Sequence, residues 1–262
     1  MRTASVNGID IAFSDSGGDG PAVVLSHGYL MDSSMFDLQV AALAPEYRVI
    51  AWDERGFGGT RATGSFSYWD SARDVIGLLD HLGIGQAVLG GMSQGGFLSL
   101  RAALLAPDRV RALVLIDSQA GQEDPAAAPA YEQLDQTWLE HGPVPVQDIV
   151  ASIILGPPDG PVDYAPWFAK WAATDRQELH LAFRCLMDRD DITGRLGEIT
   201  CPTLIVHGTA DAAISMDRAE QVEAGLGGKT TLVPIDGGSH AANLSNPDQV
   251  NVAMLEFLRA LP

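Results

Sequence analysis

A serine set between glycines is the residue of this 262-residue chain whose surroundings most favour chemistry. It lies in Gly91-Met92-Ser93-Gln94-Gly95, with the apolar run AVL before it and the amphipathic run FLSLRAALLA after it. A strand that turns sharply into a helix raises the residue at the turn into open space, and flanking glycines remove Cβ atoms that would clash there. We therefore expect Ser93 to be a nucleophile at the positive end of the following helix.

A serine hydroxyl needs a base to accept its proton, and histidine is suited to that role near neutral pH. Of six histidines, His240 lies in the glycine-rich stretch DGGSHAANLSNPDQV, between the last expected strand and the last expected helix. Such a loop carries a side chain over the carboxyl edge of a parallel sheet, where active sites lie. His240 is therefore the predicted base. The other five are expected to pack or to orient loops: His27, His81, His141, His180 and His207.

The base must be oriented by a third group, and two aspartates compete for that role. Asp211 follows an apolar run in LIVHGTADAAIS, and Asp117 ends the apolar run ALVLIDS. The chain order Ser93, Asp211, His240 is the order expected when the nucleophile sits on a strand-to-helix turn of a parallel sheet. We therefore predict Asp211 as the orienting acid and keep Asp117 as the alternative.

Acyl transfer also needs N–H donors aimed at the oxyanion that develops in the transition state. The backbone N–H of Gln94, directly after the nucleophile, is one expected donor. The turn SHGYL supplies the second, because Gly28 lets the backbone swing inward and brings the N–H of Tyr29 toward the serine. The ring of Tyr29 either forms a wall of the substrate pocket or simply packs.

Strands and helices that would position these residues alternate along the chain. Around Asn7-Gly8 the pattern predicts a hairpin with a type I′ turn. Apolar runs at 21–28, 47–60, 86–91, 110–118, 201–208 and 229–240 contain the expected strands. Helical spacing occurs at 35–47, 67–84 with Ser67 as N-cap, 94–109, 216–226 and 247–261. This alternation indicates an α/β fold whose mostly parallel sheet has helices on both faces.

The alternation stops between residues 121 and 190, where prolines and glycines separate short apolar pieces and no β run occurs. We expect a helical cap there, inserted between a first core segment (1–120) and a second one (191–262). Three of the five tryptophans lie in this region, namely Trp138, Trp167 and Trp171. They either bind substrate or form the small core of the cap itself, since aromatic side chains serve both purposes.

The composition indicates which classes of partner the chain binds and in which compartment it acts. A net charge of −18 disfavours nucleic acids and anionic membranes, which attract basic surfaces. Two cysteines, Cys185 and Cys201, provide neither a disulfide framework nor a metal cluster. The N-terminal stretch MRTASVNGIDIAF lacks the apolar core of a signal peptide, and no run of about eighteen apolar residues occurs. A cytoplasmic enzyme is expected, with the homo-oligomeric state left open.

Five blocks of the sequence together resemble the α/β-hydrolase fold superfamily. They are LSHGYLMDSSMFDLQVAAL, YRVIAWDERGFGGT, GGMSQGG, PTLIVHGTAD and GGSHAANLSNPDQV, in this order. The resemblance implies an eight-stranded, mostly parallel sheet with a helical cap after the sixth strand. It also implies Ser93, Asp211 and His240 as a catalytic triad and Tyr29 and Gln94 as oxyanion donors. The branch most resembled contains enol-lactonases, carboxylesterases and cofactor-free haloperoxidase-like hydrolases.

The resemblance implies a reaction class more clearly than a substrate. We expect hydrolysis of a small carboxylic ester or lactone through an acyl-serine, with no metal and no organic cofactor. The alternatives are hydrolytic C–C cleavage of a diketone-like acid, a perhydrolase or haloperoxidase side activity, and a receptor that retains the triad. An acidic substrate would call for a cationic pocket, for which the candidates are Arg55, Arg61 and Arg184.

Overall fold

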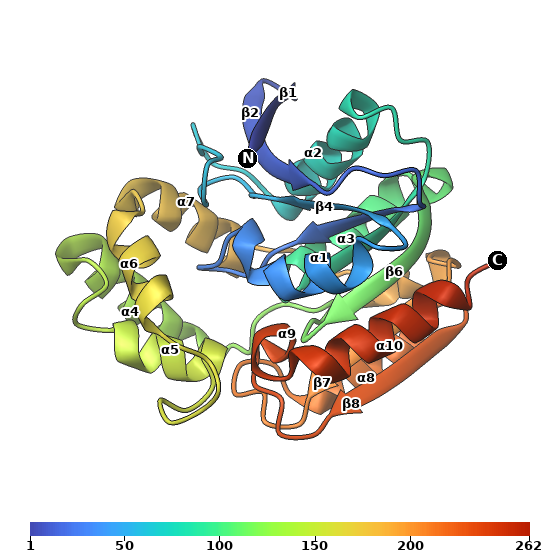
Figure 1. The fold of residues 1–262 in the computed structure, drawn as a ribbon. Coiled ribbons are helices and arrows are strands. Elements are labelled where there is room, and N and C mark those ends of the chain that lie inside the picture. The colour runs from blue at the N-terminus through green and yellow to red at the C-terminus, as the bar shows by residue number, and fades with distance from the viewer.

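Eight strands form a single sheet in the computed structural model, which describes residues 1–262 (Figure 1). The strands are β1 (Arg2–Val6), β2 (Ile9–Asp15), β3 (Ala22–Ser26), β4 (Arg48–Trp52), β5 (Ala87–Met92), β6 (Val110–Ile116), β7 (Thr203–Gly208) and β8 (Thr230–Ile235). Their order across the sheet is β1-β2-β4-β3-β5-β6-β7-β8. The β1–β2 and β2–β4 pairs are antiparallel, and every other pair is parallel. This is the mostly parallel sheet that the sequence predicted.

The antiparallel edge begins with the predicted hairpin. Asn7 and Gly8 both have positive φ, at 50° and 80°, as a type I′ turn requires. In the middle of the sheet the strands are covered on both faces, and all six residues of β5 and all six of β7 are buried. The apolar runs 87–89 of β5 and 204–206 of β7 follow from that double coverage.

Successive residues of the central strands point into two different cores. Val23 and Leu25 belong to one core and Val24 to the other, because neighbouring side chains of a strand point to opposite faces. The first core contains α1 (Asp37–Leu43), α9 (Ala242–Ser245) and α10 (Pro247–Arg259). The second contains α2 (Tyr68–His81), α3 (Gln94–Leu105) and α8 (Met216–Gly225). Helices therefore cover both faces. Three short 3-10 turns complete this part: η1 (Ser33–Phe36), η2 (Pro107–Arg109) and η3 (Thr193–Glu198).

Four further helices lie between β6 and β7, as the sequence predicted. They are α4 (Ala128–His141), α5 (Gln147–Leu155), α6 (Ala165–Ala173) and α7 (Arg176–Met187), here called the cap, and they gather beside the sheet at the left of Figure 1. The apolar side chains of the cap continue the first core, since Trp138, Ile154 and Trp171 are part of it. None of the helices is both long and apolar enough to cross a membrane.

Candidate active site

Ser93 stands alone between the end of β5 and the first residue of α3. Its backbone has φ 51° and ψ −115°, a conformation that costs free energy for a residue with a Cβ. The neighbouring glycines permit this turn by close approach. A Cβ on Gly91 would lie 2.0 Å from the carbonyl carbon of Gly95, and a Cβ on Gly95 would lie 1.9 Å from the carbonyl oxygen of Ser26. The turn is therefore the sharp strand-to-helix turn that the glycine spacing predicted.

Hydrogen bonds hold the strained residue in place. The N–H of Ser93 donates to the carbonyl of Ile116 on the neighbouring β6, over 2.9 Å. Its carbonyl accepts the backbone N–H groups of Gly96 and Phe97 and the Oγ–H of Ser118, the last over 2.8 Å. The backbone is therefore fixed on both sides while the side chain remains free to face a cavity.

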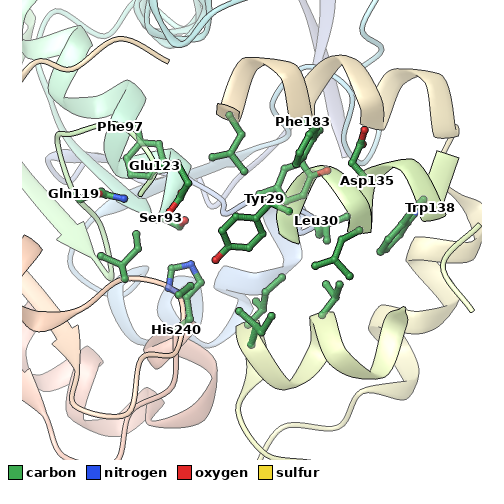
Figure 2. Close-up of a pocket in the computed structure, with 18 residues that line it drawn as sticks. Tyr29, Leu30, Ser93, Phe97, Gln119, Glu123, Asp135, Trp138, Phe183 and His240 are labelled. Atoms are coloured by element: carbon green, nitrogen blue, oxygen red, sulfur yellow. The ribbon is translucent and has the colours of Figure 1, made fainter. Parts of the chain in front are cut away.

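His240 and Ser93 both line that cavity, called here the Ser93 cavity, and Figure 2 shows them close together. His240 lies on the loop between β8 and α9. Its Nδ1 is 2.9 Å from Oδ2 of Asp211. A hydrogen bond to a carboxylate places the proton on Nδ1 and leaves Nε2 as a proton acceptor.

Asp211 is held by its own turn as well as by the imidazole. Its Oδ1 accepts the N–H groups of Ala213 and Ile214, over 2.8 and 2.9 Å. Burial raises the pKa of Asp211, but the charge and hydrogen bond of His240 and these two amides outweigh burial, so that the net pKa is below its ordinary value. The carboxylate that orients His240 is therefore ionised at neutral pH.

Asp117, the alternative acid, has a different set of partners. Its carboxyl group accepts the N–H of Gly208 over 2.7 Å and that of Ala242 over 3.0 Å. Burial, and then the charge of Asp211, raise its pKa well above the ordinary value. Asp117 thus ties the end of β7 to the loop that carries His240, while Asp211 makes the contact with the imidazole.

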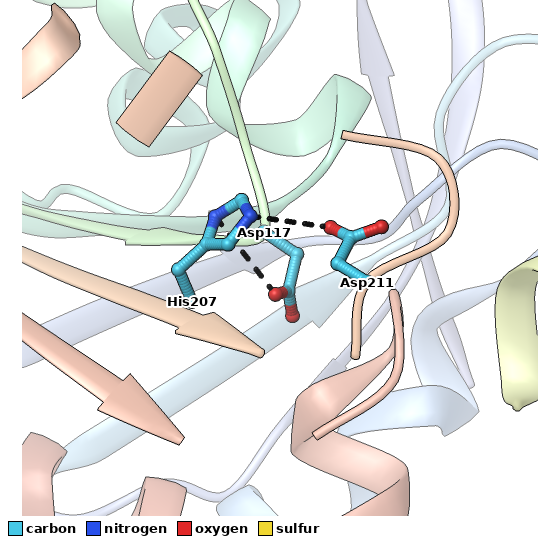
Figure 3. Close-up of side chains that lie close together, drawn as sticks. All are labelled: Asp117, His207 and Asp211. Carbon is cyan, nitrogen blue, oxygen red and sulfur yellow. Dashed lines mark ion pairs between the residues drawn. The ribbon is translucent and has the colours of Figure 1, made fainter. Parts of the chain in front are cut away.

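Figure 3 shows Asp117 and Asp211 next to His207, each joined to its ring by a dashed line, a grouping whose residue types could hold a metal ion. Nε2 of His207 donates to the carbonyl of Ile214 over 2.9 Å and lies 3.5 Å from Oδ2 of Asp211. The two carboxyl groups already accept the backbone and imidazole bonds described above, so the cluster fixes loops, and within it Nδ1 of His207 is the atom left without a hydrogen-bond partner. Burial lowers the pKa of His207, which favours this neutral, structural state.

The two predicted oxyanion donors lie on two different turns, Gln94 at the start of α3 and Tyr29 in the turn that follows β3. Gln94 is the first residue of α3, so its N–H has no carbonyl partner within the helix. The N–H of Tyr29 makes no hydrogen bond in the chain. Gly28 brings its turn against the end of β5, because a Cβ there would lie 2.3 Å from Sδ of Met92. Trp171 of α6 holds the turn from the other side by donating its Nε1–H to the carbonyl of Leu30, over 2.6 Å.

Thirteen of the eighteen side chains that line the Ser93 cavity are hydrophobic. Tyr29 and Trp138 line it, as predicted for substrate contacts, whereas Trp167 and Trp171 do not. Trp171 stacks edge-on against Trp138 with 5.7 Å between ring centroids, and Lys170 covers Trp167 at 4.6 Å. The structure thus places these two tryptophans in the core of the cap, which is the second of the two roles considered.

The pattern described as the alpha/beta hydrolase fold matches residues 21–247.

The chain belongs to the α/β-hydrolase fold family.

Individual relatives of this α/β hydrolase are distant. Epoxide hydrolase A of Mycobacterium tuberculosis is 28% identical, with 99% of this chain and 97% of that protein covered. A thermophilic esterase from Thermogutta terrifontis superposes with a TM-score of 0.90 at 27% identity, covering 99% and 98% of the two chains. The enol-lactonase of Burkholderia xenovorans gives 0.87 at 25% identity, covering 98% and 100%.

The three arginines considered for an acidic substrate do not line the Ser93 cavity of this α/β hydrolase. Arg55 binds the buried carboxylate of Asp74 over 2.6 Å. Arg61 pairs with Glu178, and Arg184 pairs with Asp188 and Glu132. These residues were candidates only in the case of an acidic substrate, and each has an acidic partner elsewhere.

Several polar residues of the site were not predicted from the sequence. Glu54 is fully buried beside the nucleophile turn, where its Oε1 accepts Nε2 of Gln94 over 3.2 Å. Its signal was the acidic pair Asp53-Glu54 directly after the strand RVIAW. Glu123 and Asp135 line the cavity. Asp135 lies three residues before Trp138 on α4, so the helical period could have placed it on the same face.

Proposed function

We propose that this α/β hydrolase cleaves a carboxylic ester or lactone through an acyl-Ser93 intermediate. The observation that carries the proposal is the strained turn that presents Ser93 to a cavity shared with His240, whose Nδ1 is bound to Asp211. A nucleophile, a base and an orienting acid in this relation activate serine in acyl transfer. The similarity to an esterase and to an enol-lactonase supports the same reaction class.

The first half-reaction forms the acyl-enzyme. Nε2 of His240 takes the proton from the Ser93 hydroxyl as Oγ attacks the carbonyl carbon. The carbonyl oxygen becomes an oxyanion and accepts the N–H groups of Tyr29 and Gln94. Each such donor is worth roughly 10²–10³-fold in rate. His240 then gives its proton to the departing alkoxide, which leaves as an alcohol, or stays attached when the substrate is a lactone.

Deacylation reverses the roles with water in place of the alcohol. His240 accepts a proton from the water that attacks the acyl carbon, and it returns this proton to Oγ of Ser93 as the carboxylic acid leaves. Asp211 stays ionised throughout and stabilises the imidazolium. The cavity is mainly apolar, which strengthens these charge interactions by excluding water.

Turnover of p-nitrophenyl butyrate by the wild type and by Ser93→Ala tests the proposal. The variant should lose at least about 10³-fold in kcat, because the remaining groups cannot form an acyl intermediate. Ser5→Ala, in the exposed part of β1, is the control and should retain wild-type turnover. Equal rates in the wild type and Ser93→Ala would refute the assignment of Ser93.

A further inference from the structure

The polar groups of the Ser93 cavity restrict the charge of its substrate, an inference that rests on the proposed function. Glu123 and Asp135 line the cavity, and no lysine or arginine does. Figure 2 shows Glu123 on the Phe97 side of Ser93 and Asp135 beyond Tyr29, near Trp138. Acidic groups therefore lie on both sides of the nucleophile.

Each carboxyl group has a hydrogen-bond partner outside the lining. Oδ2 of Asp135 is 2.7 Å from Nδ1 of His180, and Oε2 of Glu123 is 3.3 Å from Nη2 of the buried Arg189. These hydrogen bonds leave the cavity without a free cation. Burial raises the pKa of Asp135 above its ordinary value, and the hydrogen bond with His180 opposes that rise. A substrate carboxylate would lose its water there and meet two groups of its own charge.

The charge of Asp135 also reaches the catalytic end of the cavity. Burial raises the pKa of Tyr29 well above its ordinary value, and the carboxylate of Asp135 raises it further. In Figure 2 the ring of Tyr29 lies between Asp135 and the pair formed by Ser93 and His240, with its hydroxyl toward that pair. An anionic acyl group near Tyr29 would therefore be repelled at the point where it must bind.

Two buried polar atoms of the lining point to the groups that the substrate does carry. Oε1 of Gln119 and Nε1 of Trp138 have no hydrogen-bond partner, and each residue is only 4% exposed. Figure 2 places them on opposite sides of Tyr29. Buried polar atoms are almost always paired, so a ligand with neutral donors and acceptors fits these positions.

We propose that the Ser93 cavity selects an uncharged ester or lactone, one that carries no carboxylate and pairs neutral polar groups with Gln119 or Trp138. The indole N–H calls for an acceptor such as a carbonyl, ether or hydroxyl oxygen. The amide oxygen of Gln119 calls for a hydroxyl or N–H donor. The selection follows from the charges and unpaired atoms of the lining and is separate from the chemistry at Ser93.

Three esters of equal acyl length test the selection at pH 7.5: p-nitrophenyl hexanoate, p-nitrophenyl methyl adipate and mono-p-nitrophenyl adipate. The wild type should hydrolyse the anionic half-ester with kcat/KM at least about 100-fold below that of its methyl ester. Equal values for these two would overturn the inference and leave the proposed function standing. Failure with all three esters would overturn the proposed function, and the inference with it.

A charge variant tests the cause of the selection. Glu123→Gln leaves Arg189 without its carboxylate beside the cavity, so the ratio of half-ester to methyl ester in kcat/KM should rise about tenfold. Glu132→Gln, on the exposed side of α4 and paired with Arg184, is the control and should leave the ratio as in the wild type. An unchanged ratio in Glu123→Gln would contradict the electrostatic cause.

The unpaired atoms are tested by Gln119→Leu and Trp138→Phe, made singly. One of the two residues lies on the side of the cavity that holds the acyl chain. In its variant, the ratio of kcat/KM for p-nitrophenyl methyl adipate to kcat/KM for p-nitrophenyl hexanoate should fall roughly 5- to 10-fold, because the methyl ester group loses a hydrogen-bond partner. An unchanged preference in both variants would overturn the role given to these two atoms.

Discussion

The carboxylate of Asp211 divides its two oxygens between its own turn and a histidine. Oδ1 accepts the amides of Ala213 and Ile214, and Oδ2 faces Nδ1 of His240. Asp117 instead accepts a backbone N–H group with each of its two oxygens. These two aspartates lie close to the same loop, the one that carries His240. They nevertheless have different roles, because different hydrogen-bond donors reach their oxygens.

This difference predicts unequal effects of two matched substitutions. Asp211→Asn should lower kcat for p-nitrophenyl butyrate by about 10³–10⁴-fold, because an amide favours the wrong imidazole tautomer. Asp117→Asn should lower kcat only about tenfold, through movement of the loop at Ala242, since an amide keeps one of the two acceptors. A larger loss of kcat in a folded Asp117→Asn protein would show that Asp117 is the orienting acid.

At the level of secondary-structure elements, the feature that can be tested is the close packing at the β5–α3 turn. Gly95 lies so near Ser26 on β3 that no side chain fits between them. Gly95→Ala should therefore shift the turn, lower the free energy of unfolding by about 2–4 kcal/mol and reduce kcat at least about 100-fold. Gly85→Ala is the control, because a Cβ there meets no atom within 4 Å. Denaturant unfolding and ester turnover measure both effects, and a wild-type kcat in Gly95→Ala would contradict this account of the turn.

Elements with strong local signals could be predicted from the sequence. The Asn7-Gly8 hairpin and the helix that begins after Ser67 follow from turn and capping chemistry, and α2 does begin with a capping box of Ser67 and Asp70. The glycine spacing around Ser93 likewise identified the turn. In the hairpin and the capping box neighbouring residues determine the backbone conformation. At Ser93 the signal is the pair of glycines that the close approach of Gly91 to Gly95 and of Gly95 to Ser26 requires.

The cap could be predicted as helical, but its inward face could not. Trp138 and Trp171 have the same side chain and both are buried, yet the indole N–H of Trp171 reaches the carbonyl of Leu30 while that of Trp138 has no partner. That distinction depends on how α4 and α6 pack over the Tyr29 turn. The charges of the cavity were missed for the same reason, since Glu123 and Asp135 enter it only through tertiary packing.

At the scale of the whole molecule, stability should depend on the pH through a buried acid. Burial raises the pKa of Glu54 well above its ordinary value, so the folded protein holds this proton more tightly than the unfolded chain. The resulting stabilisation is complete below the unfolded pKa of about 4.3. It is lost as the pH rises through the higher folded pKa.

Glu54→Gln should therefore be more stable than the wild type, by a margin that grows from about pH 5 upward. The amide retains an acceptor for Gln94 and carries no charge to bury. Thermal unfolding of both proteins between pH 5 and pH 8 measures the margin. Glu220→Gln, on the exposed surface of α8, controls for the change in net charge from −18. A margin that shrinks with rising pH would contradict the raised pKa.

The central claim, that Ser93 is an activated nucleophile, is tested most directly by covalent labelling. The wild-type protein would be treated with a fluorophosphonate, which phosphonylates activated serines, and digested for peptide mapping by mass spectrometry. We expect one adduct per chain, on Ser93, and a greatly slowed reaction in His240→Ala. An unlabelled Ser93 in a protein that hydrolyses p-nitrophenyl butyrate, or an adduct on another residue, would contradict it.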